Sequence, residues 1–150
     1  LMQTIRADDY RGKRVAFDVQ VRTEGNVAIV RPWVRVDSIA LGRVVAFDNA
    51  ANQGQMIDGT SAWTTRTIVI DVPAGGDVIS YGVILAGNGR LWVDAASLDV
   101  VGPETPTTAQ PLAVANLPLP PRRPDPSRLP RAPVNADFER TVPIDPTQDR

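Results

Sequence analysis

The feature of this sequence that most constrains its fold is a two-residue alternation of apolar and polar side chains, which recurs between residues 14 and 101. Over residues 14–22, one face is wholly apolar and consists of Val15, Phe17, Val19 and Val21. Successive side chains of a β-strand point to opposite faces, so this period predicts a strand that is buried on one face. No segment before residue 102 shows an apolar stripe with the helical period of 3.6 residues. The fold is therefore expected to be built from strands.

Further segments share this alternation and are separated by turn signals. Residues 1–6 read as a short extended segment, and strands are expected at 27–37, 43–47, 63–72, 77–85 and 90–101. The tripeptide Gly87-Asn88-Gly89 is typical of a hairpin turn. Short strands at this spacing predict an all-β fold, an antiparallel sandwich or barrel. Pro32 cannot donate to a sheet ladder, so it predicts that its strand lies at a sheet edge or carries a bulge.

Proline content divides the chain near residue 102. Of the 14 prolines, only Pro32 and Pro73 precede that point. Proline-rich chain cannot continue a ladder or a helix and favours an extended conformation. We therefore expect a β-sandwich over residues 1–101, a linker or strap over 102–133, and a terminal segment over 134–150. The tail either tethers a neighbouring domain or lies across the sandwich or a partner, and its last segment either adds an edge strand or begins another domain.

The charge balance bears on partners. Sixteen basic and seventeen acidic residues give a formal net charge of -1, so no bulk field attracts nucleic acid or an anionic membrane. Direct binding of nucleic acid by the sandwich is not expected. No apolar run has the length that a transmembrane helix needs.

Catalysis has few candidates in this sequence. There is no histidine and no cysteine, which removes the commonest general base, the thiolate nucleophile and the commonest transition-metal ligands. A glycosidase would need two carboxylates facing each other across a cleft. The candidates Asp48, Asp58, Asp71 and Asp94 show no spacing that pairs them. We expect no catalytic residues and a protein that is not an enzyme.

The strand expected at 27–37 carries the best candidate for a ligand site. Arg31, Trp33 and Arg35 fall on the same face, and arginines beside an indole can stack on it and donate to a hydroxylated or anionic ligand. The alternative is that the arginine stems merely cover a partly exposed tryptophan. Trp63 and Trp92 are expected to be structural instead.

Polar residues after the next strand complete the candidate site. Asp48 and Asn49 are expected to supply donors and acceptors for a carbohydrate or another small molecule bound at Trp33. The same two residues with Asp94 offer oxygen ligands of the kind that calcium takes, although no calcium-loop spacing is present. We therefore predict no metal site and no cofactor, and leave a structural calcium ion as the alternative.

Several short motifs, in a fixed order, give the chain a resemblance to a known bacterial module. The motifs are Tyr10-Arg11-Gly12-Lys13, Trp33-Val34-Arg35-Val36-Asp37, Ala46-Phe47-Asp48-Asn49, Gly59-Thr60, Trp63, Ile70-Asp71-Val72-Pro73, Tyr81-Gly82, Leu85-Ala86-Gly87 and Trp92-Val93-Asp94. Over residues 1–101 the chain resembles a jelly-roll accessory domain of bacterial AraC-type transcriptional regulators, similar in plan to galactose-binding-like and carbohydrate-binding modules. The resemblance implies an antiparallel two-sheet jelly-roll sandwich with a proline-rich C-terminal extension, and opening strands that precede Leu1. It also favours the cytoplasm, a compartment on which the residues are otherwise silent.

Two functional hypotheses follow. The first is a non-catalytic module that binds a carbohydrate or another small molecule and is accessory to a larger bacterial regulatory protein. The second is a structural or oligomerising domain whose C-terminal tail pairs with another copy or with a protein partner. The identity of the ligand and the oligomeric state are left open by the sequence.

Overall fold

The computed structural model describes residues 1–51, 54, 56–108, 118–119 and 125–138. Seven strands account for most of the described residues, and a 3-10 turn at Pro126–Arg128 follows them. The strands are β1 (Met2–Arg6), β2 (Arg14–Glu24), β3 (Val27–Ser38), β4 (Arg43–Asp48), β5 (Ser61–Asp71), β6 (Val78–Gly87) and β7 (Arg90–Val101). The part of the chain described here contains no helix long and apolar enough to cross a membrane.

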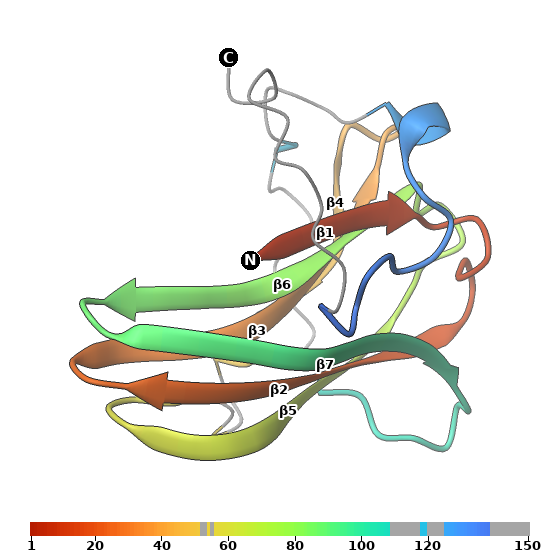
Figure 1. The fold of residues 1–150 in the computed structure, drawn as a ribbon. Coiled ribbons are helices and arrows are strands. Elements are labelled where there is room, and N and C mark those ends of the chain that lie inside the picture. Colours follow the sequence, from red (N-terminus) through yellow and green to blue (C-terminus); the bar gives the residue numbers. More distant parts are fainter. Residues whose placement is uncertain (52–53, 55, 109–117, 120–124, 139–150) are drawn as a thin grey trace.

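The strands form two antiparallel sheets that pack face to face (Figure 1). Sheet A has the order β1-β6-β3-β4, and sheet B has the order β5-β2-β7. Two of the pairings are nested in chain order: β2 pairs with β7, and β3 and β6, which lie between them in the sequence, pair with each other. The predicted fold class, an all-β antiparallel two-sheet sandwich, is confirmed.

The predicted alternation places the core between the sheets. Val15, Phe17, Val19 and Val21 of β2 are each no more than 1% exposed. Burial of side chains of this size contributes about 1.5–3 kcal/mol each relative to exposure. Phe17 of β2 meets Tyr81 of β6 with ring centroids 5.1 Å apart at an interplanar angle of 54°, a tilted contact that joins the two layers. Core residues contributed by β3, β5 and β6 include Val30, Val34, Val36, Ile68, Ile70, Ile79 and Val83.

Of the two expectations for the strand that carries Pro32, the edge position is wrong, whereas register irregularities are present. β3 lies inside sheet A, between β6 and β4, and its register shifts between Val27 and Ile29 and between Val36 and Asp37. Its pairing with β4, however, begins only at Val34, and Val30 pairs instead with Ile57 of the β4–β5 loop. Val30 donates its N–H to Ile57, and Pro32, two residues along, directs its nitrogen to the same side. Proline therefore occupies the gap between those two partners, where no ladder bond is lost.

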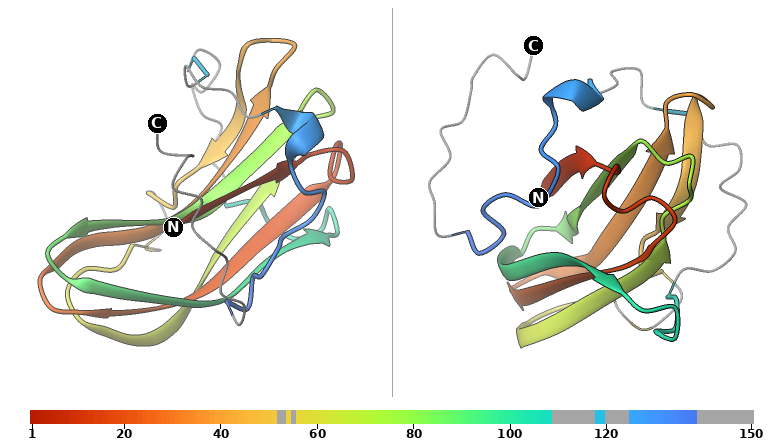
Figure 2. Two further views of the ribbon diagram at one scale, coloured as in Figure 1. Left: turned by 45° about the horizontal axis from the view of Figure 1, so that its top comes forward. Right: turned by 90° about the vertical axis from the view of Figure 1, so that its right-hand side faces the viewer.

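The sandwich has two lateral sides, at which the edges of the sheets meet. We call them the β4/β5 side and the β1/β7 side. On the β4/β5 side the opening is covered by the loop after β4 and by Thr108, which exchanges backbone and side-chain hydrogen bonds with Val69 of β5. Figure 2 shows the two sheets close together at the β2–β3 and β6–β7 hairpins and diverging toward the other ends of their strands.

Residues 125–138, which we call the strap, cover the β1/β7 side. Arg6 of β1 donates its backbone N–H to the Pro130 carbonyl oxygen (2.9 Å), and Ala96 of β7 donates to the Ala136 carbonyl oxygen (3.0 Å). In Figure 1 this segment (blue) descends from the 3-10 turn past β1 toward β7. Of the alternatives for the tail, this part lies across the sandwich. Residues 134–138 form a turn and not the added edge strand, while 109–117, 120–124 and 139–150 of the expected linker and terminal segment lie outside the described residues.

Candidate functional site

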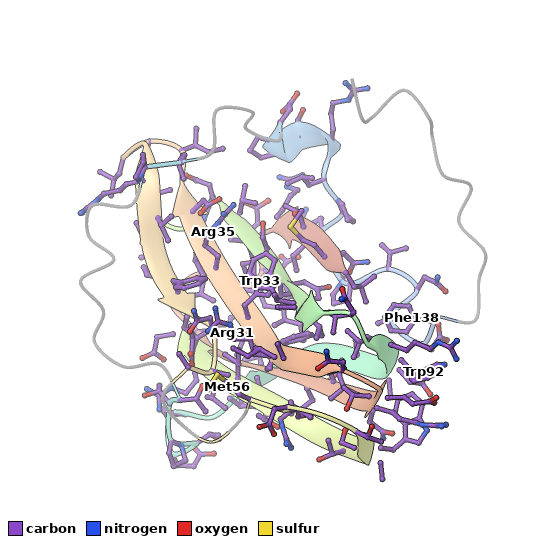
Figure 3. All side chains as sticks on the ribbon, turned by 90° about the vertical axis from the view of Figure 1, so that its left-hand side faces the viewer. Arg31, Trp33, Arg35, Met56, Trp92 and Phe138 are labelled. Carbon is purple, nitrogen blue, oxygen red and sulfur yellow. The ribbon has the colours of Figure 1, made fainter. Side chains whose placement is uncertain are left out.

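Arg31, Trp33 and Arg35 lie on the outer face of sheet A (Figure 3). They alternate along β3 with buried residues of the core, so the two-residue period directs all three away from the interior. Each of the three is half-buried. The ladder expected from the sequence is therefore present as a geometric unit.

Arg35 is already engaged by a carboxylate. Its Nε lies 2.9 Å from Oδ1 of Asp37, and its Nη2 donates to Oδ2 at 3.0 Å. Asp37 is 4% exposed, and this burial raises the pKa of its carboxyl group although Arg35 acts to lower it. The positive charge of Arg35 is thus balanced within the sheet, which leaves Arg31 as the cation of the ladder.

Arg31 differs from Arg35 in its partners. Its Nε is buried and has no hydrogen-bond partner among the described residues. The β3–β6 register places Ile84 opposite Arg31, and the antiparallel bridge between Val30 and Ile57 brings Met56 to its other side. Ile84 is 40% exposed and Met56 is 41% exposed. An unsatisfied donor therefore stands on a partly apolar surface beside the indole of Trp33.

Asp48 is not part of this surface. The register pairs it with Val34, whose side chain points into the core, and Asp48 is only 7% exposed. Its Oδ1 accepts the backbone N–H of Ala50 (2.9 Å), and its Oδ2 accepts the hydroxyl of Thr108 (2.7 Å). The structure thus gives Asp48 a structural task on the β4/β5 side, on the opposite face of sheet A from the ladder.

Asn49 is likewise used by the loop. Its Oδ1 accepts the backbone N–H of Ala51 at 3.2 Å, a local turn of the kind that asparagine favours. The alternative calcium set is dispersed, since Asp48 belongs to β4 at one lateral edge and Asp94 to β7 at the other. No group of three or more His, Cys, Asp or Glu side chains able to hold a metal ion occurs within residues 1–51, 54, 56–108, 118–119 and 125–138.

The two tryptophans expected to be structural lie on sheet B. Trp63 is 46% exposed, so the expectation of a core role is wrong for this residue. Trp92 is half-buried, and the guanidinium carbon of Arg22 lies 4.8 Å from its ring centroid, a cation–π contact. The signal for Trp63 was already in the sequence, because Ile68 and Ile70 point inward and the same period directs residue 63 outward.

The candidate carboxylates do not form a catalytic pair in the contacts that they make. Asp71 binds Arg14 through both oxygens, at 2.7 Å to Nε and 3.0 Å to Nη2. The hydrogen bond from Arg14 holds the pKa of Asp71 below its usual range. Asp94 accepts the N–H of Ala95, and Asp58 is exposed.

Sequence reasoning missed a cavity on the β1/β7 side. It has a volume of about 70 Å³ and opens between the two sheets beneath the strap. Gln3 stands at its rim, where its Oε1 accepts the hydroxyl of Tyr81 and the N–H of Val134 while its Nε2 donates to the Val134 carbonyl oxygen. The cavity walls are formed by Leu1, Met2, Gln3, Phe17, Val19, Tyr81, Gly82, Val83, Val93, Ala96, Asn135, Ala136 and Phe138.

The chain is similar to part of a bacterial protein. The chain is 37% identical over 139 residues to the protein named uncharacterized HTH-type transcriptional regulator YbfP of Bacillus subtilis (strain 168). The match covers 93% of this chain but only 42% of that protein. No family model matches the chain, and no solved structure matches it. The resemblance to part of a bacterial regulator, expected from the motifs, is supported at that level.

Proposed function

We propose that this chain is a non-catalytic, ligand-binding jelly-roll module that is accessory to a larger bacterial regulatory protein. The similarity to a protein named as an HTH-type regulator supports the regulatory setting. The match spans 42% of that protein's length, which supports an accessory part of a larger protein. The nested pairing of β2 with β7 and of β3 with β6 supports the jelly-roll plan. The contacts of the candidate carboxylates are compatible with a non-catalytic role, because Asp48 and Asp71 are occupied by internal partners.

The observation that carries the ligand-binding proposal is the unpaired donor of Arg31. Buried polar groups in proteins are nearly always hydrogen-bonded, so an exception calls for an explanation, and a bound ligand is one. The Nε of Arg31 has no hydrogen bond among the described residues. The Nε atoms of Arg6 and Arg35 also lack one, but these two arginines form ion pairs with Asp8 and Asp37. A ligand acceptor that displaces the side chains covering the Arg31 nitrogen would satisfy it.

The surroundings of Arg31 favour a hydroxylated ligand. Trp33 offers an aromatic face, and Met56 and Ile84 flank the arginine with apolar surface. Sugars combine apolar C–H faces with hydroxyl acceptors, which matches this mixture of surfaces. Among the described residues Arg31 forms no ion pair, whereas Arg35 is paired with Asp37, so a singly charged or neutral ligand suits the face better than a dianion. We therefore propose a carbohydrate or a similar polyhydroxylated molecule.

A glycan array followed by calorimetric titration tests this function. We expect Trp33→Ala and Arg31→Met each to weaken binding by about tenfold or more, because each removes a stacking or charge-assisted contact. Trp63→Ala is the matched control, since it removes an exposed tryptophan from the other sheet and should leave binding unchanged. The proposal fails if no glycan binds, or if Trp33→Ala binds as tightly as the unaltered chain.

A second candidate function is supported by the way the strap is held. Its backbone bonds to β1 and β7 could equally be made by the strap of another copy, as in domain swapping. Light scattering on the full chain and on a chain ending at residue 108 tests this role. A dimer that becomes monomeric on truncation supports an oligomerising domain, whereas a monomer in both cases rejects it.

A further inference from the structure

We propose that the cavity on the β1/β7 side is a second binding site, for a short aliphatic molecule carrying one hydroxyl group, and that the strap is its cover. This site is distinct from the outer face of sheet A and does not depend on the ladder. It lies between the sheets, whereas Arg31 and Trp33 point away from them.

The walls of the cavity determine the size and the apolar character of the part of the ligand that they enclose. Phe17 and Val19 of β2, Val83 of β6 and Val93 of β7 present hydrocarbon from both sheets. A cavity of roughly 150 Å³ with such a lining binds benzene. The volume here is about 70 Å³, so the cavity suits the narrow end of a short alkyl chain that enters through its opening, and not a whole aromatic ring. Ala96 is the smallest side chain on the β7 wall, and its size leaves room that a larger residue would fill.

The polar residues at the rim of the cavity determine where the hydroxyl group of the ligand binds. Tyr81 donates its hydroxyl proton to Gln3, and within the described residues no group donates to the Tyr81 oxygen in return. Burial raises the pKa of Tyr81, so its phenol stays protonated and remains a donor at neutral pH. A ligand hydroxyl could therefore donate to the Tyr81 oxygen while its alkyl chain occupies the apolar interior.

The strap has the features of a cover that can open. Asn135 and Phe138 both have positive φ angles, 52° and 57°, a region that is unfavourable for a bulky residue such as phenylalanine. A backbone bond from Ala96 to Ala136 joins this turn to β7. That bond depends on a bulge, since Ala95 at φ 46° lies where the β2–β7 register shifts. An open depression between residues 133–137 and Ala95–Ser97 flanks the same turn.

Gln3 connects the cavity with the cover. It holds Tyr81 on the cavity side and both backbone groups of Val134 on the strap side (Nε2 to O 2.6 Å, N to Oε1 3.1 Å). A ligand hydroxyl at Tyr81 alters the hydrogen bonding of the phenol and thereby the position of Gln3. Occupancy of the cavity is therefore coupled to the docking of the strap.

Titration of the full chain with 1-butanol, followed by amide NMR, tests the site. We expect saturable shifts at Val83, Val93, Ala96 and Ala136, with none on the β4/β5 side. Shifts that grow linearly without saturation, or that spread over the whole surface, would overturn the proposal.

Variants of the cavity make the test specific. Ala96→Leu fills the cavity and should weaken 1-butanol binding by about tenfold or more, while Ala62→Leu, the same change at an exposed position, should not. Val93→Ile is a smaller filling change that serves if Ala96→Leu does not fold. Undiminished binding by a folded filling variant contradicts the site.

Two further readouts test the hydroxyl and the cover. Tyr81→Phe keeps the ring and should weaken 1-butanol binding by about fivefold, as loss of one hydrogen bond predicts, and unchanged binding rejects the role of the phenol. Hydrogen exchange of the Val134 amide should change by at least about threefold on saturation with 1-butanol, and an unchanged rate rejects the coupling to the strap. Trp33→Ala should leave all of these results as they are, which separates this site from the proposed carbohydrate face.

Discussion

The two lateral sides of the sandwich are closed by different chemistry. On the β4/β5 side a buried carboxylate, Asp48, holds the start of the loop and Thr108 together, and Thr108 in turn bonds to Val69. On the β1/β7 side the strap is held by an amide side chain, Gln3, by backbone bonds to Arg6 and Ala96, and by an exposed ion pair between Arg131 and Asp9. An apolar cavity lies beneath the strap. The same two sheets are therefore closed by a buried carboxylate on one side and by exposed hydrogen bonds of the strap on the other.

The physical basis of the difference is burial. A hydrogen bond to an ionised group contributes about 1.5–3 kcal/mol to stability. When the acceptor is removed, the buried donors are left without a partner, and this lowers the free energy of unfolding. The carboxylate of Asp48 is 7% exposed, so this penalty applies. The bonds of Gln3 to Val134 are exposed, where water can replace them. We therefore expect a closure of the second kind to open at a smaller free energy than unfolding of the whole domain.

The largest expected loss of stability follows removal of the Asp48 carboxylate on the β4/β5 side. Asp48→Ala leaves the Ala50 N–H and the Thr108 hydroxyl without their carboxylate, so we expect the free energy of unfolding to fall by about 2–3 kcal/mol in urea denaturation. Asn49→Ala, which removes one exposed turn bond, is the control and should lower it by less than about 1 kcal/mol. Equal losses in both variants would show that Asp48 does not seal this side.

Removing the side chain that holds the strap should have a smaller global effect and a larger local one. Gln3→Ala should lower the free energy of unfolding by about 1 kcal/mol, because its neutral bonds are partly replaced by water. Trypsin should then cleave faster after Arg131, since the strap is released. Gln20→Ala, on an exposed position of β2, provides the control for both measurements. Cleavage at the same rate in both variants would contradict the role given to Gln3.

A matched pair of glycine substitutions compares the backbones of the two sides. Ala95 and Ala50 both have positive φ angles, 46° and 58°. Relief of about 1–2 kcal/mol of strain is offset by about 0.5–1 kcal/mol of chain entropy, so Ala95→Gly should stabilise by about 0.5 kcal/mol. Ala50 is 2% exposed, and loss of its buried methyl group, worth about 0.8 kcal/mol, should cancel the gain. Thermal unfolding of both variants measures the difference, and identical shifts would show that burial does not distinguish the two sides.

The smallest effect concerns the ion pair at the outer end of the strap. Arg131 lies 3.0 Å from Asp9, and its hydrogen bond holds the pKa of Asp9 below the ordinary value of 3.8. A lowered folded-state pKa means that the stabilisation is fully present above 3.8 and is lost as the pH falls through the lowered value. The Val134 amide shift should therefore titrate below pH 4 in the unaltered chain and not in Arg131→Ala. If the Val134 amide titrates in the same way in the unaltered chain and in Arg131→Ala, the ion pair with Asp9 does not help to hold the strap.

The sequence was sufficient for the strands and for most of the core, because the two-residue period is a local property. The positions of Val15, Phe17, Val19 and Val21 follow from it directly. Pro32 shows the limit of local reasoning. Its effect on hydrogen bonding is predictable, but the gap that accommodates it depends on Ile57 and β4 reaching β3 at particular residues.

The candidate site was predictable only in part, for the same reason. Arg31, Trp33 and Arg35 share a face because they lie two residues apart on one strand. Asp48 was predicted to lie near these three residues because it ends the next strand in the sequence. Its hydrogen-bond partner is instead Thr108, which is 60 positions away in the chain. The cavity depends on how the strap meets β1 and β7, and no periodicity in the proline-rich segment encodes that register.

Native-state hydrogen exchange of four amides tests the central contrast most directly. Ala96 and Val134 report on the β1/β7 side, and Ala50 and Val69 report on the β4/β5 side. If the strap opens independently, the first pair should be less protected than the second by a factor on the order of 100, and the difference should persist in low denaturant. Equal protection factors for all four amides would mean that both sides open only with the whole domain, and would contradict the account.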